Sequence, residues 1–372
     1  MAAGIAYATV AVLFINLQPA VEGTLASAFG LNAAQVGMTA AIESGTSIFG
    51  GLLVARAIAP TRARLLVGLS IATFILANGL TASVHSLWGV IVTRAMAGIG
   101  EGALLGVSFS IIAHSRLTHR AFGFFGVAQT LSGIAGFQLL AWLIRAHGWT
   151  TPFWTFATIG VASLALLPWL TAITVSHNPQ RHYAIRVYSI IGLASILVLF
   201  AAQSAIWPFL ELIGKARGVG DPQIAAGLSL AALCGLAGSA CATALSARTA
   251  GMAACWVAAA MSVVAIMGIA FGDTSRSYLI AIGGFYFAWA FFMPLQLGVL
   301  KKVDAGPRIF VLASIATSCG FAAGPAIGGL LVHGSDYSRV YMFGILGTLA
   351  ATLLLFFSTG RSALGRAVAD LA

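Results

Sequence analysis

Four ionisable side chains stand inside long apolar runs in the first half of the sequence. They are Glu22, Glu43, Arg94 and Glu101, in a chain of 372 residues that has only nine acidic residues. A charge at the centre of a bilayer costs about 3 kcal/mol on insertion scales, so such a side chain normally faces protein or water and has a partner. Buried carboxyl groups can bind and release protons, and an arginine can pair with them or with an anionic ligand. The four residues therefore predict a polar site inside a membrane bundle.

The composition of the chain is that of an integral membrane protein. Hydrophobic residues make up 60% of it and charged residues only 8%, far from the values of soluble domains. A spanning helix needs about 20 mostly apolar residues, whereas barrel strands are about half as long and alternate in polarity. We therefore predict an all-α membrane protein with twelve transmembrane helices, at residues 5–28, 36–58, 64–84, 88–113, 121–144, 152–175, 186–209, 222–246, 252–271, 277–300, 309–332 and 338–358.

The positive charges are unevenly distributed between the predicted loops. With the N-terminus in the cytoplasm, thirteen lysines and arginines fall in inner segments and five in outer loops. The positive-inside rule favours this orientation, which predicts a multi-pass protein of the plasma (bacterial inner) membrane with both termini cytoplasmic. The net charge of +10 then reflects topology and attraction to anionic membrane lipids, and no nucleic-acid partner is expected.

Matching residues recur between the two halves at an offset of 188 positions. Gly50 returns as Gly238, Gly136 as Gly324, and the stretch 30–36 resembles 218–224. Because 188 residues hold six predicted spans, an even number, both copies cross the membrane in the same direction. Transporters use such parallel repeats to build a cavity between two halves. We predict two six-helix bundles related by a pseudo-twofold axis, residues 1–180 and 181–372.

Two segments resemble motifs of the major facilitator superfamily of transporters. The loop after the first predicted span reads Phe29-Gly-Leu-Asn-Ala-Ala-Gln35-Val-Gly37, and the fourth span contains Arg94-Ala-Met-Ala-Gly98-Ile-Gly100-Glu101-Gly102. The resemblance covers nearly the whole chain. It implies a secondary transporter, and transporters of this superfamily often use an acid on span 1 or 4 for proton coupling.

Two further segments match the superfamily in part. After the second span, Gly51, Leu53 and Arg56 fit the superfamily's loop signature, but Ala55 stands at its acidic position, where the inner-gate charge pairing would be made. The stretch Gly320-Phe-Ala-Ala-Gly324-Pro325-Ala-Ile-Gly328-Gly329 is similar to a pattern of drug/proton antiporters, although they carry it in the fifth span and this chain in the eleventh. The antiporter-like branch is therefore favoured.

Glycines in two spans repeat at a spacing of four residues. Gly320, Gly324 and Gly328 share one face of the eleventh span, where Pro325 introduces a kink, and Gly98 and Gly102 share one face of the fourth. Such a face is either a static packing seam or a sliding surface that opens and closes a cavity. We assign these residues, together with Arg56, to gating or helix packing.

Helix geometry places Glu22, Glu43 and Arg94 at one depth, roughly 10 Å below the outer boundary. Two carboxylates there could share the guanidinium, although Glu43 and Arg94 could also form a purely structural pair and Glu22 could be merely hydrated. Glu101 lies seven residues beyond Arg94, about 10 Å deeper, where it stands alone near the midplane. We predict proton coupling at Glu101 and at Glu22, with Arg94 and Glu43 as charge partners or Arg94 as ligand of a substrate anion.

In the second half the predicted site becomes aromatic. At the repeat offset Glu101 corresponds to Trp289 and Gly98 to Tyr286, so buried charge is confined to the first half. Aromatic faces bind flat or cationic molecules. We place at the substrate cavity Tyr286, Trp289, Gln203, Trp207, Asn16, Gln18 and Gln129, although the amides could equally serve as glue between helices.

The sequence predicts a secondary active transporter working by alternating access on protons and a small-molecule substrate. The favoured activity is proton-coupled export of small amphipathic or cationic compounds. An alternative is proton symport of a small organic anion, and a remote one is a membrane enzyme or sensor on a transporter scaffold. No phosphate loop, catalytic triad or metal-ligand spacing stands in the sequence, so we expect no catalytic residue, metal ion or cofactor. We expect a monomer.

Overall fold

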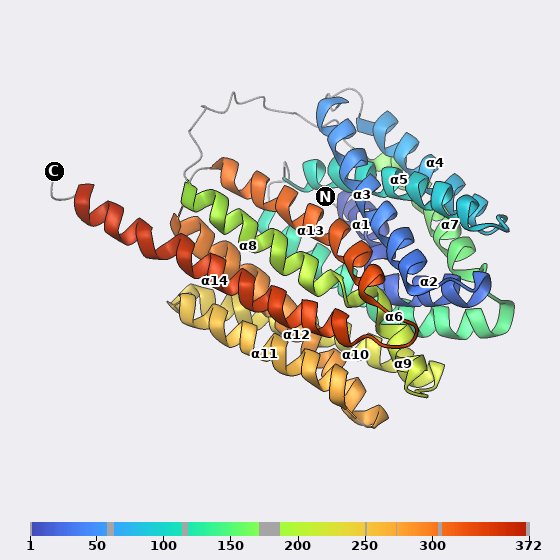
Figure 1. The fold of residues 1–372 in the computed structure, drawn as a ribbon. Helices are drawn as coiled ribbons and strands as arrows, with labels where there is room; N and C mark the ends of the chain where they lie inside the picture. The colour runs from blue at the N-terminus through green and yellow to red at the C-terminus, as the bar shows by residue number, and fades with distance from the viewer. Residues whose placement is uncertain are drawn as a thin grey trace. The chain divides into compact units, whose positions relative to one another are not determined.

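The computed structural model describes residues 2–57, 63–113, 118–170, 187–249, 251–272, 274–303 and 307–369. Within these ranges the chain is helical, and the only β-type pairing is an isolated bridge between His333 and Asp336. The chain divides into two compact units, Met1–Asn178 and Pro179–Ala372, called unit 1 and unit 2 below (Figure 1). The predicted boundary at residue 180 falls outside the described residues.

Eleven helical segments of the described chain are long and apolar enough to cross a membrane. They are Ala2–Phe29, Ala33–Ala55, Ala63–Thr81, Leu87–Ala113, Arg120–His147, Val187–Ala216, Asp221–Leu245, Met252–Phe271, Ser275–Val303, Ile309–Leu331 and Ser338–Thr359. They coincide with eleven of the twelve predicted spans. The prediction of a multi-pass helical membrane protein is confirmed.

The sixth predicted span, at 152–175, is shorter than expected where the structure describes it. Helix α7 covers only Thr151–Leu164 and is followed by a 3-10 turn, η2, at Leu167–Trp169. Pro168 has no amide hydrogen, so it cannot donate the bond to the Leu164 carbonyl that would continue the helix. Residues from 171 onward lie outside the described part of the chain.

Unit 1 is organised around α5 (Leu87–Ala113), which packs against α1 (Ala2–Ala11), α3 (Ala33–Ala57) and α4 (Ala63–Thr81). The first span consists of α1 and α2 (Leu13–Phe29), separated at Val12. Helix α6 (Thr118–His147) packs against α1 and α2, and α7 packs against α4. These contacts place α5 between α3 and α4, which cover buried side chains of α5 such as Arg94.

In unit 2, α12 (Ser275–Val303) packs against α10 (Asp221–Thr249) and α11 (Met252–Phe271), and α8 (Val187–Ser204) packs against α13 (Pro307–Leu331) and α14 (Ser338–Ala369). The seventh predicted span is interrupted after α8 by a 3-10 turn, η3, at Trp207–Phe209, and continues as α9 (Leu210–Ala216). Pro208 lies in this turn, as its missing donor requires.

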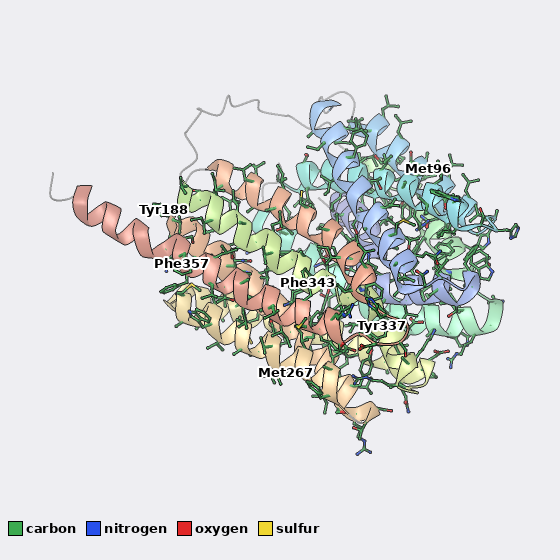
Figure 2. All side chains as sticks on the ribbon, in the orientation of Figure 1. Met96, Tyr188, Met267, Tyr337, Phe343 and Phe357 are labelled. Atoms are coloured by element: carbon green, nitrogen blue, oxygen red, sulfur yellow. The ribbon has the colours of Figure 1, made fainter. Side chains whose placement is uncertain are left out.

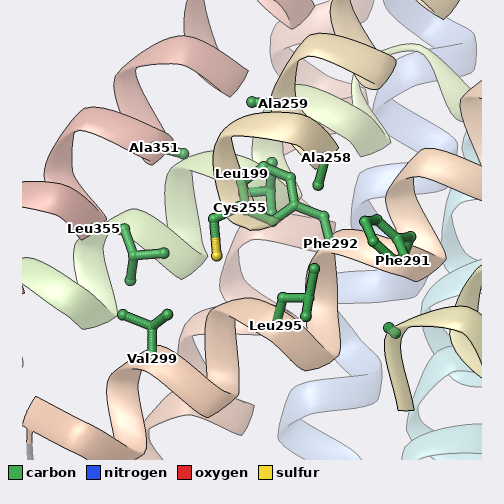
Figure 3. Packing of buried hydrophobic residues seen from close by; sticks show 11 residues of the cluster. Leu199, Cys255, Ala258, Ala259, Phe291, Phe292, Leu295, Val299, Ala351 and Leu355 are labelled. Atoms are coloured by element: carbon green, nitrogen blue, oxygen red, sulfur yellow. The ribbon is translucent and has the colours of Figure 1, made fainter. Parts of the chain in front are cut away.

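Both the interior and the outer faces of unit 2 are apolar. Its core packs aromatic and aliphatic side chains of α8, α11, α12 and α14, among them Leu199, Phe292 and Leu355 (Figure 3). Other apolar side chains are exposed, such as Met267 on α11 and Phe357 on α14 (Figure 2). Apolar side chains on both faces of a helix are typical of a protein whose outer surface contacts lipid.

Candidate functional site

Arg94 on α5 is the centre of a buried polar network in unit 1. Its Nη1 donates to Oε1 of Glu43 on α3 at 3.1 Å. Its Nη2 donates to Oδ1 of Asn78 at 3.0 Å and to Oγ1 of Thr81 at 2.7 Å, both on α4. The guanidinium carbon also lies 5.0 Å from the ring centroid of Phe153 on α7. The sequence analysis expected Arg94 to meet Glu43, and the structure brings the two together.

Asn78, Thr81 and Phe153 were not among the predicted site residues. Asn78 and Thr81 stand three positions apart and therefore share one face of α4, and both are fully buried. A polar pair at this spacing, near the C-terminal end of an otherwise apolar span, was the available signal for partners of Arg94. Phe153 carried no comparable signal, because its contact depends on how α7 packs.

Glu22 on α2 is fully buried and is bound by α3. Thr39 donates its hydroxyl to Oε2 of Glu22 at 2.7 Å, whereas Oε1 has no hydrogen-bond partner among the described residues. Glu22 interacts electrostatically with Glu43 and Arg94, but in the described chain the ion pair of Arg94 is with Glu43 alone. Of the two carboxylates predicted to share Arg94, only Glu43 forms an ion pair with it among the described residues, and Glu22 interacts with it electrostatically.

Glu101 does not stand alone as the depth argument predicted. Its carboxyl interacts with both Glu43 and Arg94, and the carboxyl groups of Glu101 and Glu43 lie within hydrogen-bonding reach of each other. No donor from the described protein reaches Oε1 of Glu101 or Oε2 of Glu43. A single proton between the two carboxyl groups would supply the missing hydrogen bond. The prediction failed because it measured depth along one helix and ignored the side chain that α3 contributes.

Two glycines of α5 explain how α3 comes so close. A Cβ on Gly98 would collide with the backbone carbonyl of Glu43, and a Cβ on Gly102 with that of Ser47. In unit 2 the same kind of seam joins α13 to α8, where Gly320, Gly324 and Gly328 lie against the carbonyls of Leu197, Ala201 and Ala205. Pro325 lies within α13 and is buried. These seams are closely packed; a gating role stays a prediction, and the side chain of Arg56 lies outside the described residues.

The predicted aromatic residues of unit 2 meet in one cluster. Trp207 stacks on Tyr286 with ring centroids 4.9 Å apart, and Trp289 stacks on Phe321 at 5.5 Å. Trp207 and Trp289 lie 6.4 Å apart, edge to face. Phe200 and Phe285 also contact Trp289. We call these six residues the aromatic cluster; Phe200, Phe285 and Phe321 were missed by the sequence analysis, since aromatic residues in apolar spans usually only pack.

Comparison with known proteins identifies the family. The sequence profile of the Major Facilitator Superfamily matches residues 3–303. The chain belongs to the Major Facilitator Superfamily. Among solved structures it is similar to the crystal structure of a mutant of the nucleoside transporter NupG, with a TM-score of 0.77, 12% sequence identity, and coverage of 96% of this chain and 98% of that one. At this identity the likeness shows a shared fold. Comparison with curated proteins gives no match.

Membership of the Major Facilitator Superfamily confirms the predicted superfamily and points to a transporter rather than an enzyme. The match does not single out the drug/proton antiporter branch, which stays a prediction. The substrate and the direction of transport are likewise not given by the family.

The predicted cavity amides of this superfamily member have different surroundings. Nε2 of Gln203 donates to Oγ1 of Thr348 at 3.1 Å and thereby joins α8 to α14. Nδ2 of Asn16 donates to the backbone carbonyl of Gln129 at 3.3 Å and joins α2 to α6. Gln18 is fully buried, and neither of its amide atoms has a partner within the described protein. Asn16 and Gln203 therefore join helices, although Oε1 of Gln203 has no partner among the described residues. Gln18 differs from both because its amide makes no hydrogen bond within the described protein.

Buried charge is not confined to the first half. Glu211 on α9 in unit 2 belongs to the candidate span Val187–Ala216, and its side chain is only 14% exposed. Lys215, one turn further, donates to it at 2.7 Å and lies 3.7 Å from Asp221. The prediction overlooked Glu211 because it ended the seventh span at residue 209. Unlike the carboxyl groups of unit 1, Glu211 has its own lysine.

Proposed function

We propose that the chain is a proton-coupled secondary transporter that works by alternating access and exports small amphipathic or cationic compounds. One observation carries the proposal: three buried carboxyl groups, of Glu22, Glu43 and Glu101, surround the single guanidinium of Arg94. Arg94 balances one negative charge. The two remaining carboxylates need further positive charge, because uncompensated charges inside a membrane protein are costly. A proton or a substrate cation supplies it.

The proposal includes a repeat of six spans, supported by contacts that recur at the offset of 188. The hydroxyl of Tyr7 donates to the Ser163 carbonyl at 3.2 Å, and that of Ser195 to the Ala351 carbonyl at 2.7 Å. These four positions form two pairs 188 residues apart. The glycine contacts repeat as well, since Gly50 lies against the Ile99 carbonyl and Gly238 against that of Phe287.

The repeat supplies a reason to regard the polar network as functional. The counterparts of Glu43, Asn78, Thr81 and Arg94 in unit 2 are Ala231, Ile266, Ile269 and Ile282, and all four are fully buried. The same helix pairs thus pack in unit 2 with aliphatic side chains. Buried ion pairs can often be replaced by apolar residues without loss of stability, so packing alone does not account for the network in unit 1.

The geometry assigns different roles to the charged groups. Arg94 is anchored by Glu43, Asn78 and Thr81, and among the described residues only its Nε lacks a partner. This speaks against the alternative in which Arg94 binds a substrate anion. Oε1 of Glu101, by contrast, has no hydrogen-bond partner among the described residues. We infer that the proton resides between Glu101 and Glu43 and that Arg94 holds Glu43 in place.

The aromatic cluster supports a cationic or planar substrate. We infer that a substrate inserts next to these rings, because aromatic rings attract cations by up to about 2 kcal/mol when desolvated. A substrate cation and a proton would then alternate in compensating the excess negative charge of the three carboxyl groups, each at its own carboxyl group. Such an exchange keeps the charge in the membrane constant, which is why antiport is favoured over symport.

The test uses inverted membrane vesicles that contain the full chain and carry an imposed pH gradient. Addition of a cationic amphipathic dye should release protons from vesicles with the native protein, whereas co-uptake of protons with an organic anion would support symport. Glu101→Gln should abolish pH-dependent dye accumulation. The matched control is Glu211→Gln, which neutralises a half-buried carboxyl of unit 2 and should retain it. Unchanged accumulation with Glu101→Gln would refute the coupling role.

A further inference from the structure

Two neighbouring side chains of α2 carry hydrogen-bonding atoms that the described protein does not use. Gln18 and Glu22 are four residues apart, so they share one face of the helix, and both are fully buried. Nε2 and Oε1 of Gln18 and Oε1 of Glu22 have no hydrogen-bond partner in the described ranges. Because leaving buried polar atoms unpaired costs stability, each such atom calls for a reason.

The hydrogen bond from Thr39 to Glu22 shows which residues of α2 and α3 lie at the same level along the two helices. Helices α2 and α3 follow each other through a short connection and run in opposite directions. One turn deeper than the contact, or about 6 Å, stand Gln18 on α2 and Glu43 on α3. Oε2 of Glu43 is also unused by the described protein. Two acceptors that the described protein leaves free, Oε1 of Gln18 and Oε1 of Glu22, therefore lie within about one helical turn, next to the Glu43 carboxyl that faces Glu101.

Packing does not require polar residues at these two positions of α2. At the repeat offset Gln18 corresponds to Ile206 and Glu22 to Leu210. Both counterparts are fully buried in unit 2. Two apolar side chains are therefore sufficient for packing at these positions in unit 2. The amide and the carboxylate at the same positions of unit 1 need a different explanation.

The free atoms define the chemistry of a ligand. The carboxylate of Glu22 favours a positive charge, and free acceptor oxygens favour a group that donates several hydrogen bonds. An organic ammonium with N–H groups satisfies both conditions, whereas a quaternary ammonium satisfies only the first. The amide nitrogen of Gln18 can donate to an oxygen on the same ligand, such as a hydroxyl next to the ammonium.

We propose that Gln18 and Glu22 form a binding site for the N–H-bearing ammonium head of a small organic cation. The proposal rests on the proposed function and deepens it, because it names the substrate class and separates two roles. Glu22 binds the substrate cation, while Glu101 and Glu43 hold the transported proton. The predicted role of Glu22 in proton coupling is thereby replaced by one in substrate recognition.

The experiment compares two probes that differ in whether the ammonium nitrogen carries hydrogen atoms or methyl groups. The first is 2-amino-1-phenylethanol, which is cationic at neutral pH, and the second is its N,N,N-trimethyl analogue. Binding to the purified full-length chain is measured by calorimetric titration without a proton gradient. The native protein should bind the first probe about tenfold more tightly, the effect of one well-formed hydrogen bond.

Variants assign the preference to the two side chains. Gln18→Met keeps the volume and removes the amide, so it should abolish the tenfold preference. Gln18→Asn, a shortened amide, should lose most of it and serves as the second variant if methionine disturbs folding. Glu22→Gln, which still accepts from Thr39, should weaken binding of both probes by tenfold or more. Gln296→Met removes a buried amide of unit 2 that donates to Ser195 and should bind like the native protein.

Three results would overturn the proposal: a preference that survives both Gln18 variants, native affinities in Glu22→Gln, or no saturable binding of either probe to the native chain. The first result would mean that bound water satisfies the amide of Gln18. Glu101→Gln should bind both probes with native affinity while losing proton release. Failure of the ammonium site is therefore distinguishable from failure of proton coupling.

Discussion

Glu43 on α3 and Arg94 on α5 form an ion pair of 3.1 Å in which neither side chain is exposed. Removing one partner of a buried pair leaves the other charge uncompensated and typically costs about 3–5 kcal/mol. The counterparts of the two residues in unit 2 are Ala231 and Ile282. We therefore expect a variant in which the whole network is replaced by apolar residues to be more stable than one in which Arg94 alone is replaced.

We expect Arg94→Ile alone to lower the unfolding free energy by about 3–5 kcal/mol. Adding Glu43→Ala, Asn78→Ile and Thr81→Ile introduces the residues found at the equivalent positions of unit 2. This fourfold variant should recover most of the lost stability, but neither it nor Arg94→Ile should transport. Thermal unfolding of the purified protein in detergent measures the first effect, and vesicle transport measures the second. A fourfold variant that transports like the native protein would show that the network has no function.

Because α3 and α5 approach each other closely at Gly98, we expect that the protein does not tolerate any larger residue at this position. A Cβ there would meet the carbonyl of Glu43, which is backbone and cannot move aside. Gly98→Ala should therefore destabilise the protein by about 1–3 kcal/mol or more. Gly123→Ala on α6 is the matched control, because nothing lies within 4 Å of its added Cβ, and it should be neutral or slightly stabilising. Equal unfolding temperatures for the two variants would contradict the close packing of α3 against α5 at Gly98.

The sequence predicts features that depend on local residue patterns, but not those that depend on how the helices pack. Length and apolarity of the spans are local properties, so eleven spans and the membrane class could be predicted. The pairing of Arg94 with Glu43 could also be predicted, because helix rise along two spans puts them at one depth. The contact of Glu101 with Glu43 could not, since it depends on glycines that bring two backbones together. That the Gln18 amide has no partner within the described part of the chain could not be predicted either, because burial of an amide and the absence of its partners are properties of packing.

Arg217 binds the C-terminal end of helix α11 in unit 2, and we expect these hydrogen bonds to stabilise the protein. Its Nη1 donates to the Gly272 carbonyl at 3.0 Å and its Nη2 to the Ala270 carbonyl at 2.8 Å, at the C-terminus of α11. A cation that binds the last carbonyls of a helix also opposes the helix dipole. Arg217→Ala should lower the unfolding free energy by about 1–3 kcal/mol. Arg217→Lys keeps the charge but not the fork of donors, so it should restore only part of the loss; full restoration would mean that charge alone stabilises this end.

Trp289 lies at the centre of the aromatic cluster, in contact with Trp207, Tyr286 and Phe321. Under the proposed function its ring contributes to the binding of aromatic cations, by about 1 kcal/mol. Trp289→Leu should therefore raise the concentration of dye for half-maximal transport about fivefold and leave proton release per transported dye unchanged. Trp88→Leu is the control, because its ring is 75% exposed on α5 and should not affect transport. If Trp289→Leu changed the proton stoichiometry and left affinity intact, the cluster would serve coupling and not recognition, since a recognition surface acts on substrate affinity alone.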